Sequence, residues 1–157
     1  MQLTKIKEFL DGNKIKYEII EHSSAFTAQK VAANAHIPGK EFAKTVIIKV
    51  DGKMAMAVLP ATYKVNFDQL KKTLGKEKIR LAYEQEFMDK FPDCEVGAMP
   101  PFGNLYEMDV YVAESLTEDE DIAFNACSHS ELIKMKFTDF EKLVKPKRIK
   151  FDVIMQT

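Results

Sequence analysis

Two stretches of this sequence carry residues whose type and position could do chemistry, and the first is an apolar run that contains a lysine. Lys44 lies inside the run from Phe42 to Ile48. A cation is costly among apolar residues unless it faces solvent or a cleft. Counting by two, Lys44 shares one face of the expected strand with Val46 and Ile48, which favours a lysine at the rim of a cleft. A functional lysine and ordinary strand alternation both remain open on this evidence.

The second stretch is VGAMPPFG, residues 96–103, of which we call residues 97–101 the Gly-Pro segment. Pro100 and Pro101 have no amide donor and push the residues before them toward extended geometry, so the stretch is neither helix nor central strand. Glycine permits close approach of a ligand to the backbone, and proline keeps neighbouring amides in place. A binding loop and a plain turn both fit. Met99 and Phe102 are likewise open between pocket lining and core.

The histidines and cysteines form no recognised motif. His22, His36 and His129 show no HExxH-type spacing, so no metal site is expected. Cys94 and Cys127 are the only 2 cysteines and show no CxxC spacing. One possible pair is a poor disulfide framework, so both are expected to be reduced thiols. Cys94 is interpreted as a small packing residue and not as a nucleophile.

Length and charge limit the classes of protein. A chain of 157 residues predicts one domain with a sizeable core. A formal net charge of −1 argues against a protein that holds nucleic acid by bulk electrostatics alone, and DNA is not an expected partner. The N-terminal residues mix charges with apolar side chains, so neither a signal peptide nor a membrane span is expected. The sequence indicates a cytoplasmic protein without a cofactor.

In the first half of the chain, local signals predict alternating helices and strands. The strongest is a hairpin, because Asp51-Gly52 separates the apolar runs 42–50 and 54–60. The other expected elements are a helix over 4–11, a strand over 16–22, a helix beginning at Thr27, a helix over 67–74 capped by Asn66 and ended by Gly75, a strand over 79–83 and a helix over 84–91.

In the second half, the segments 109–116, 122–127 and 131–137 predict a meander of three strands. A last helix over 138–144 is expected to be capped by Thr138. The alternating tail 147–157 fits a closing strand or an edge used by a partner. Together these elements predict a mixed α/β single domain over 1–144 with a central, mostly antiparallel, barrel-like sheet and short flanking helices, followed by an extension over 145–157.

In combination, several segments resemble the YbaK/EbsC family, which includes the editing domain inserted in bacterial prolyl-tRNA synthetases and its free-standing relatives. The resemblance covers about residues 22–140. It is carried by HSSAFTAQKVA, AKTVIIKVDGK, VLPATYKVNFDQLKK, EVGAMPPFGNLY and FNACSHSELIKMKFTDF. It departs from the family at Cys127, where glycine is frequent.

The resemblance implies a barrel-like α/β fold and hydrolysis of the ester of mischarged aminoacyl-tRNA by a trans-acting editing factor. A lysine matching Lys44 is required for activity in the family, and the G-x-x-x-P pattern matching Gly97 to Pro101 borders the amino-acid pocket. Catalytic roles are therefore expected for Lys44, Gly97 and Ala98. Substrate contacts are expected from His22, Thr27, Thr45, Met99, Pro100, Pro101, Phe102, Gly103 and His129.

An activated ester needs a placed water and donors to the oxygen that gains charge. The sequence predicts that amides around Gly97, Ala98 and Met99 supply those donors and that Lys44 orients the substrate. The resemblance to the family implies that a ribose hydroxyl of the tRNA assists the water. The expected partner is the acceptor end of an aminoacyl-tRNA carrying a small or medium-sized amino acid, with a synthetase as an optional second partner. The alternative is a binding or regulatory module of the same fold without catalysis. The sequence does not identify the amino acid, the tRNA or the oligomeric state.

Overall fold

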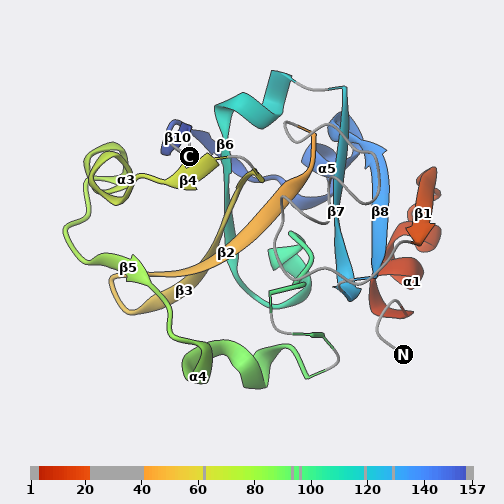
Figure 1. Ribbon diagram of the computed structural model, residues 1–157, viewed down its shortest axis with the longest axis horizontal. Coiled ribbons are helices and arrows are strands. Elements are labelled where there is room, and N and C mark those ends of the chain that lie inside the picture. Colours follow the sequence, from red (N-terminus) through yellow and green to blue (C-terminus); the bar gives the residue numbers. More distant parts are fainter. Residues whose placement is uncertain are drawn as a thin grey trace.

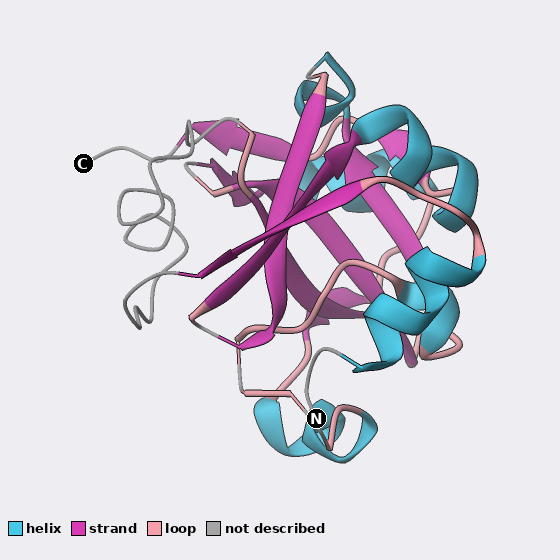
Figure 2. Ribbon diagram, turned by 90° about the vertical axis from the view of Figure 1, so that its right-hand side faces the viewer, coloured by secondary structure: helices cyan, strands magenta, loops and turns pink. Residues whose placement is uncertain are grey.

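The computed structural model describes residues 4–21, 41–61, 63–92, 94–95, 97–118, 120–128 and 130–154. Within these ranges the strands form a five-stranded sheet, a three-stranded sheet and a two-stranded ladder (Figure 1). Viewed from the side, strands of the fold cross one another (Figure 2). Side chains of the two larger sheets pack together in one apolar cluster.

The five-stranded sheet has the order β5-β2-β3-β6-β9. Its centre is the hairpin of β2 (Ala43–Val50) and β3 (Lys53–Pro60). Asp51 and Gly52 make the turn with φ values of 50° and 86°, which glycine adopts without steric cost. The strand β5 (Ile79–Leu81) pairs antiparallel with β2, whereas β6 (Asp109–Ala113) runs parallel to β3 and β9 (Lys147–Ile149) runs parallel to β6.

The three-stranded sheet is antiparallel, with β8 (Glu131–Lys136) between β1 (Tyr17–Glu21) and β7 (Asp121–Ser128). The ladder joins β4 (Tyr63–Val65) to β10 (Asp152–Ile154). A parallel bridge between Phe42 and Ala123 joins the two larger sheets, and the Ala123 amide donates to the Glu41 carbonyl at 3.0 Å. This bridge places the beginning of β2 beside β7.

The described helices are α1 (Thr4–Gly12), α3 (Phe67–Leu74), α4 (Glu84–Phe87) and α5 (Phe137–Val144), with 3₁₀ turns η1 (Met88–Lys90), η2 (Gly103–Leu105) and η3 (Glu114–Glu118). The Asn66 side chain accepts from the Gln69 amide at 3.1 Å and so caps α3, and Gly75 ends this helix in the left-handed conformation.

Two apolar clusters lie on opposite faces of the five-stranded sheet. The inner cluster fills the space between the two larger sheets and includes Ile47, Val58, Phe124 and Ile133 together with residues of α1 and α5. The outer cluster lies under α3 and β4 and includes Ile48, Leu59, Leu70, Tyr111 and Phe151. Because side chains alternate along a strand, each residue of β2 belongs to one of these two faces.

The structure confirms several expected elements and corrects others. The first helix, the Asp51-Gly52 hairpin and the capped helix over 67–74 are present. The helix expected from Thr27 lies outside the described residues. Most strand pairings are antiparallel, as predicted, but the described strands divide among separate sheets and form no barrel.

The meander and the last cap are also corrected. The strand β6 pairs with β3 and not with β7, because η3 and the acidic turn after it carry the chain across to the other sheet. The last helix begins at Phe137 with Lys136 at its cap, so Thr138 lies inside the helix. The residues after Val144 form β9 and β10, which pair with β6 and β4.

Candidate functional site

Lys44 lies near the start of β2, where its backbone pairs with Leu59 of β3. Its neighbours at alternate positions, Val46 and Ile48, belong to the outer cluster, so the Lys44 stem follows that apolar face. The side chain is half-buried. Burial in this apolar setting lowers the pKa of the Lys44 ammonium below its ordinary value. The structure therefore holds a partly desolvated cation at the beginning of β2.

The Gly-Pro segment packs against the end of β7. The Ala98 carbonyl accepts from the Cys127 amide at 2.9 Å, and the Glu95 amide donates to the Cys127 carbonyl at 2.9 Å. Gly97 is exposed with φ at 85°, whereas Ala98, Met99, Pro100 and Pro101 are buried. The accessible part of this segment is thus its glycine.

Ala98 does not have the donor role expected of it. Its amide already donates to the Glu95 carbonyl at 3.0 Å, which closes a turn around Gly97. An amide engaged in a turn is not available to an oxyanion without breaking that bond. The amides of Gly97 and Met99 are the remaining candidates in the segment.

Phe102 and Gly103, both expected at the substrate, lie in the core. The Phe102 side chain is 0% exposed, and its ring contacts those of Phe124, Phe140 and Phe9 at centroid distances of 5.4, 5.5 and 5.9 Å. Gly103 packs so closely that an added Cβ would lie 2.5 Å from the Met108 carbonyl oxygen. Met99 belongs to the inner cluster as well. The question left open for Met99 and Phe102 is answered in favour of the core.

Thr45 lies on the opposite face of β2 from Lys44, next in alternation to Ala43 and Ile47 of the inner cluster. Its buried hydroxyl has no hydrogen-bond partner among the described residues. Thr45 and Lys44 therefore do not approach one site from the same side of the sheet. The expected contacts from His22, Thr27 and His129 lie outside the described residues.

Asn125 is a candidate that the sequence analysis missed. It is 8% exposed, and its Oδ1 atom is buried without a hydrogen-bond partner in the described part of the chain. By alternation from the bridged pair Phe42–Ala123, Lys44 and Asn125 each lie on the same face of their own strand as the bridged residue. The available signal was a lone amide in the apolar strand IAFNAC, the same kind of signal that singled out Lys44.

The strand β7 thus connects the parts of the candidate site. Its start lies beside Phe42, two residues before Lys44, and Cys127 near its end holds Ala98. Both stretches singled out by sequence therefore have a neighbouring residue that contacts β7.

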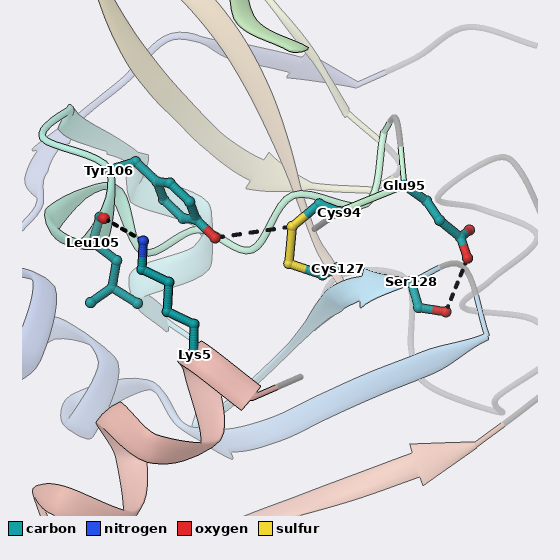
Figure 3. The surroundings of a disulfide bond; sticks show 7 residues. All are labelled: Lys5, Cys94, Glu95, Leu105, Tyr106, Cys127 and Ser128. Atoms are coloured by element: carbon teal, nitrogen blue, oxygen red, sulfur yellow. Dashed lines mark hydrogen bonds between the residues drawn. A yellow bond between two sulfur atoms is a disulfide. The ribbon is translucent and has the colours of Figure 1, made fainter. Parts of the chain in front are cut away.

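The two cysteines form a disulfide, which corrects the expectation of reduced thiols (Figure 3). The sequence separation of 33 residues hides their proximity, which arises because the Gly-Pro segment folds onto β7. Cys127 has φ at 67°, a left-handed conformation that favours glycine. A glycine at this position would adopt the same φ without steric cost.

Cavities lined by described residues lie elsewhere, around the Asp51-Gly52 turn. The one bounded by Lys49, Lys53, Lys90 and Tyr106 has a volume of about 480 Å³. Two neighbouring cavities, of about 640 and 410 Å³, share Gly52 with it. Lys44 lines none of these three, so they are separate from the candidate site.

In the described ranges, no group of three or more His, Cys, Asp and Glu side chains is arranged to hold a metal ion. No described helix has the length and apolar character needed to cross a membrane.

Residues 22–143 match the family model of the aminoacyl-tRNA editing domain. The Ser/Thr-tRNA deacylase ProXp-y of Escherichia coli is 24% identical over 140 residues, which cover 86% of this chain and 83% of that protein. The prolyl-tRNA editing protein ProX of Acetoanaerobium sticklandii is 25% identical over 143 residues, covering 87% of this chain and 86% of that protein.

The fold has close counterparts among solved structures. A proposed trans-editing enzyme for prolyl-tRNA synthetase superposes with a TM-score of 0.83 over 97% of both chains, at 13% identity. A hypothetical protein superposes with a TM-score of 0.84 over 95% of this chain and 99% of that one, at 18% identity.

Proposed function

Because this chain belongs to the aminoacyl-tRNA editing domain family, whose members include aminoacyl-tRNA deacylases, we propose that it hydrolyses the ester of mischarged tRNA in trans. The observation that carries the proposal is the half-buried Lys44 of β2, two residues after Phe42, which is bridged to β7. The strand β7 itself contains the buried Asn125 acceptor and is hydrogen-bonded through Cys127 to Ala98 of the Gly-Pro segment. The relative in E. coli is named for serine and threonine tRNAs, and amino acids of that size are the first to test.

In this mechanism Lys44 orients the charged 3′ end as a point charge, next to the terminal phosphate or the ester. A partly desolvated ammonium interacts more strongly with an anion than one in open water, because the local dielectric constant is lower. The lysine has no acid or base role, since it stays protonated through the reaction.

The oxygen that gains charge is stabilised by the amide of Gly97, the exposed residue of the segment, since the Ala98 amide is engaged with Glu95 and Met99 is buried. One such donor is worth about 2.7–4 kcal/mol in well-studied hydrolases. The attacking water is assisted by a ribose hydroxyl of the terminal adenosine. This arrangement requires no protein nucleophile.

Asn125 supplies an acceptor for the aminoacyl group. An unpaired buried carbonyl oxygen costs about 1–3 kcal/mol, a cost that a ligand donor removes. The α-ammonium of an aminoacyl ester has three N–H donors and suits this oxygen. Asn125 would thereby fix the amino acid by its backbone group and leave side-chain selection to the volume of the pocket.

The test is release of free amino acid from a panel of tRNAs mischarged with small amino acids. Lys44→Ala is expected to abolish deacylation with an unchanged circular dichroism spectrum. The matched control is Lys7→Ala, which removes an exposed lysine of α1. A fully active Lys44→Ala protein would refute the assignment.

The second candidate is a binding module of the same fold, favoured by the burial of most of the Gly-Pro segment. Measuring tRNA binding in parallel with deacylation separates the two: binding without turnover supports the module.

A further inference from the structure

Three linkages hold Cys94, Glu95 and Ala98, which lie just before and within the Gly-Pro segment, to the end of β7. Two are backbone hydrogen bonds made by Cys127, one to Ala98 and one from Glu95, and the third is the Cys94–Cys127 disulfide itself. The covalent linkage joins residues 33 positions apart in the sequence, so it closes a large loop around the segment.

The disulfide also fixes a backbone conformation that Cys127 would otherwise disfavour. A φ of 67° is uncommon for an L-residue other than asparagine and aspartate. With the disulfide closed, Cys127 is held in this conformation and presents its amide to Ala98 and its carbonyl to Glu95. Opening the disulfide leaves those two hydrogen bonds alone to oppose relaxation of the backbone.

We propose that Cys94 and Cys127 are a site of thiol–disulfide exchange with low-molecular-weight thiols, and that the state of this pair sets the rate of deacylation through the Gly-Pro segment. The part concerning rate rests on the proposed function. The part concerning exchange stands on the disulfide and its surroundings alone.

The two sulfurs differ in access. Cys94 is half-buried, near the Tyr106 hydroxyl at 4.0 Å, whereas Cys127 is 2% exposed (Figure 3). An external thiolate therefore attacks the Cys94 sulfur and breaks the disulfide, and Cys127 leaves as a thiolate that takes a proton. A second external thiolate attacks the external sulfur of the mixed disulfide and releases Cys94. In sum, two external thiols lose two electrons and two protons, and both cysteines become thiols.

Reduction is expected to slow deacylation. Once Cys127 can leave the left-handed region, the Gly97 amide no longer has a fixed position relative to the ester. Loss of positioning of this kind costs roughly 10-fold in rate, within the range seen for small displacements at active sites.

The experiment equilibrates the full chain with oxidised or reduced glutathione, counts free thiols by alkylation and mass spectrometry, and measures single-turnover deacylation. In oxidised glutathione, the protein is expected to have no free thiol and the faster deacylation rate. In reduced glutathione, both cysteines are expected to be free thiols and the deacylation rate about 10-fold lower. Two free thiols after oxidation would overturn the exchange site. Equal rates in fully oxidised and fully reduced protein would overturn the control of rate.

Two variants separate the covalent link from the backbone conformation. Cys94→Ser has no disulfide and keeps an L-residue at position 127, so it should behave as the reduced protein in both buffers. Cys127→Gly also lacks the disulfide, but glycine adopts positive φ readily, so it should keep the faster rate in both buffers. A slow Cys127→Gly protein with a native spectrum counts against the proposal.

Should no state of the protein deacylate any tRNA, the proposed function fails and the disulfide is still tested. Amide hydrogen exchange of Gly97, Ala98 and Met99, the residues of the segment that have an amide hydrogen, is then the readout. Faster exchange after reduction supports a redox-controlled segment, and equal exchange in both states contradicts it.

Discussion

At the scale of the residue, the lowered pKa of Lys44 predicts how activity depends on pH. Burial lowers this pKa because the ammonium loses water, so the charged form disappears at a lower pH than that of an exposed lysine. If the charge orients the substrate, enzymatic deacylation falls as pH rises through the lowered pKa. The measurement is the single-turnover rate against pH, with spontaneous ester hydrolysis subtracted.

The matched variant is Lys44→Arg, since arginine stays protonated over the whole range. Its activity is expected to be lower at neutral pH, because the planar guanidinium does not reproduce the lysine geometry, but without the alkaline decline. An alkaline decline at the same pH in both proteins would show that another group titrates.

Lys44 also predicts the sign of a pH effect on stability. Between its lowered folded pKa and its ordinary pKa of 10.5, the unfolded chain binds more protons than the folded one. The free energy of unfolding contributed by this group therefore rises with pH in that window.

Gly103 is a residue where a single methyl group should destabilise the fold. An added Cβ would meet the Met108 carbonyl oxygen at 2.5 Å and a Val110 methyl at 2.6 Å, in the core of the protein. Gly103→Ala is expected to lower the free energy of unfolding by about 1–3 kcal/mol, measured by urea denaturation. The control is Gly12→Ala, whose added Cβ meets nothing within 4 Å. Equal stability of the two variants would contradict the crowding at Gly103.

At the scale of the element, Glu86 joins α4 to the edge of the five-stranded sheet. Its carboxylate accepts from Arg80 of β5 at 2.8 and 2.9 Å, pairs with Lys49 of β2 at 2.7 Å, and accepts from the Tyr83 amide at 2.8 Å. The Arg80 hydrogen bonds, followed by those of Lys49 and Tyr83, hold the Glu86 pKa well below 4.5.

A carboxyl group whose pKa is lower in the folded protein than in the unfolded chain stabilises the fold at pH values above its pKa in the unfolded chain. This stabilisation is lost as the pH falls toward its pKa in the folded protein. Glu86→Gln is therefore expected to be less stable than the parent at pH 7, with a difference that shrinks below about pH 4.5. Melting temperatures from pH 7 to pH 3 measure this, with Glu84→Gln, a first-turn carboxylate of the same helix, as control. A difference independent of pH would show that the ion pairs contribute nothing.

The elements that sequence could predict are those whose cause is local. The Asp51-Gly52 turn needs positive φ at two adjacent residues, and the Asn66 and Gly75 caps lie within one helix length of each other. The parallel pairing of β6 with β3 and the Cys94–Cys127 disulfide join distant segments, and no residue type along the chain marks them. Lys44 and Asn125 are intermediate cases, since each is a polar residue in an apolar strand but only the structure brings the strands together.

At the scale of the whole molecule, the distribution of charge predicts how strongly RNA binding depends on salt concentration. Lys145, Lys147, Arg148 and Lys150 are exposed near the edge strand β9, but Arg148 is paired with Glu141 at 2.7 Å. On another part of the surface, Lys49 is paired with Glu86 at 2.7 Å. Few cations are thus available for phosphates, so the slope of log binding constant against log salt should be shallow, about −2 for roughly three contacts to a single strand.

To test this, the salt dependence of RNA binding is compared between two double variants. Lys147→Ala/Lys150→Ala removes two positive charges near β9, and the control Lys7→Ala/Lys72→Ala removes two from α1 and α3. The first double variant is expected to reduce the slope by about 1, and the second to leave it unchanged. Equal effects of both would mean that only net charge matters, and a steep slope in the parent would indicate a broad RNA-binding surface.

The inner cluster has a consequence for how the molecule comes apart. It takes side chains from both larger sheets and from α1, α4 and α5, so neither sheet can keep this apolar layer away from water without the other. The domain should consequently melt in one cooperative step, with a calorimetric enthalpy equal to the van't Hoff enthalpy. Neither sheet is expected to stay folded without the other. A destabilising substitution in either sheet should therefore lower the melting temperature of the same single transition.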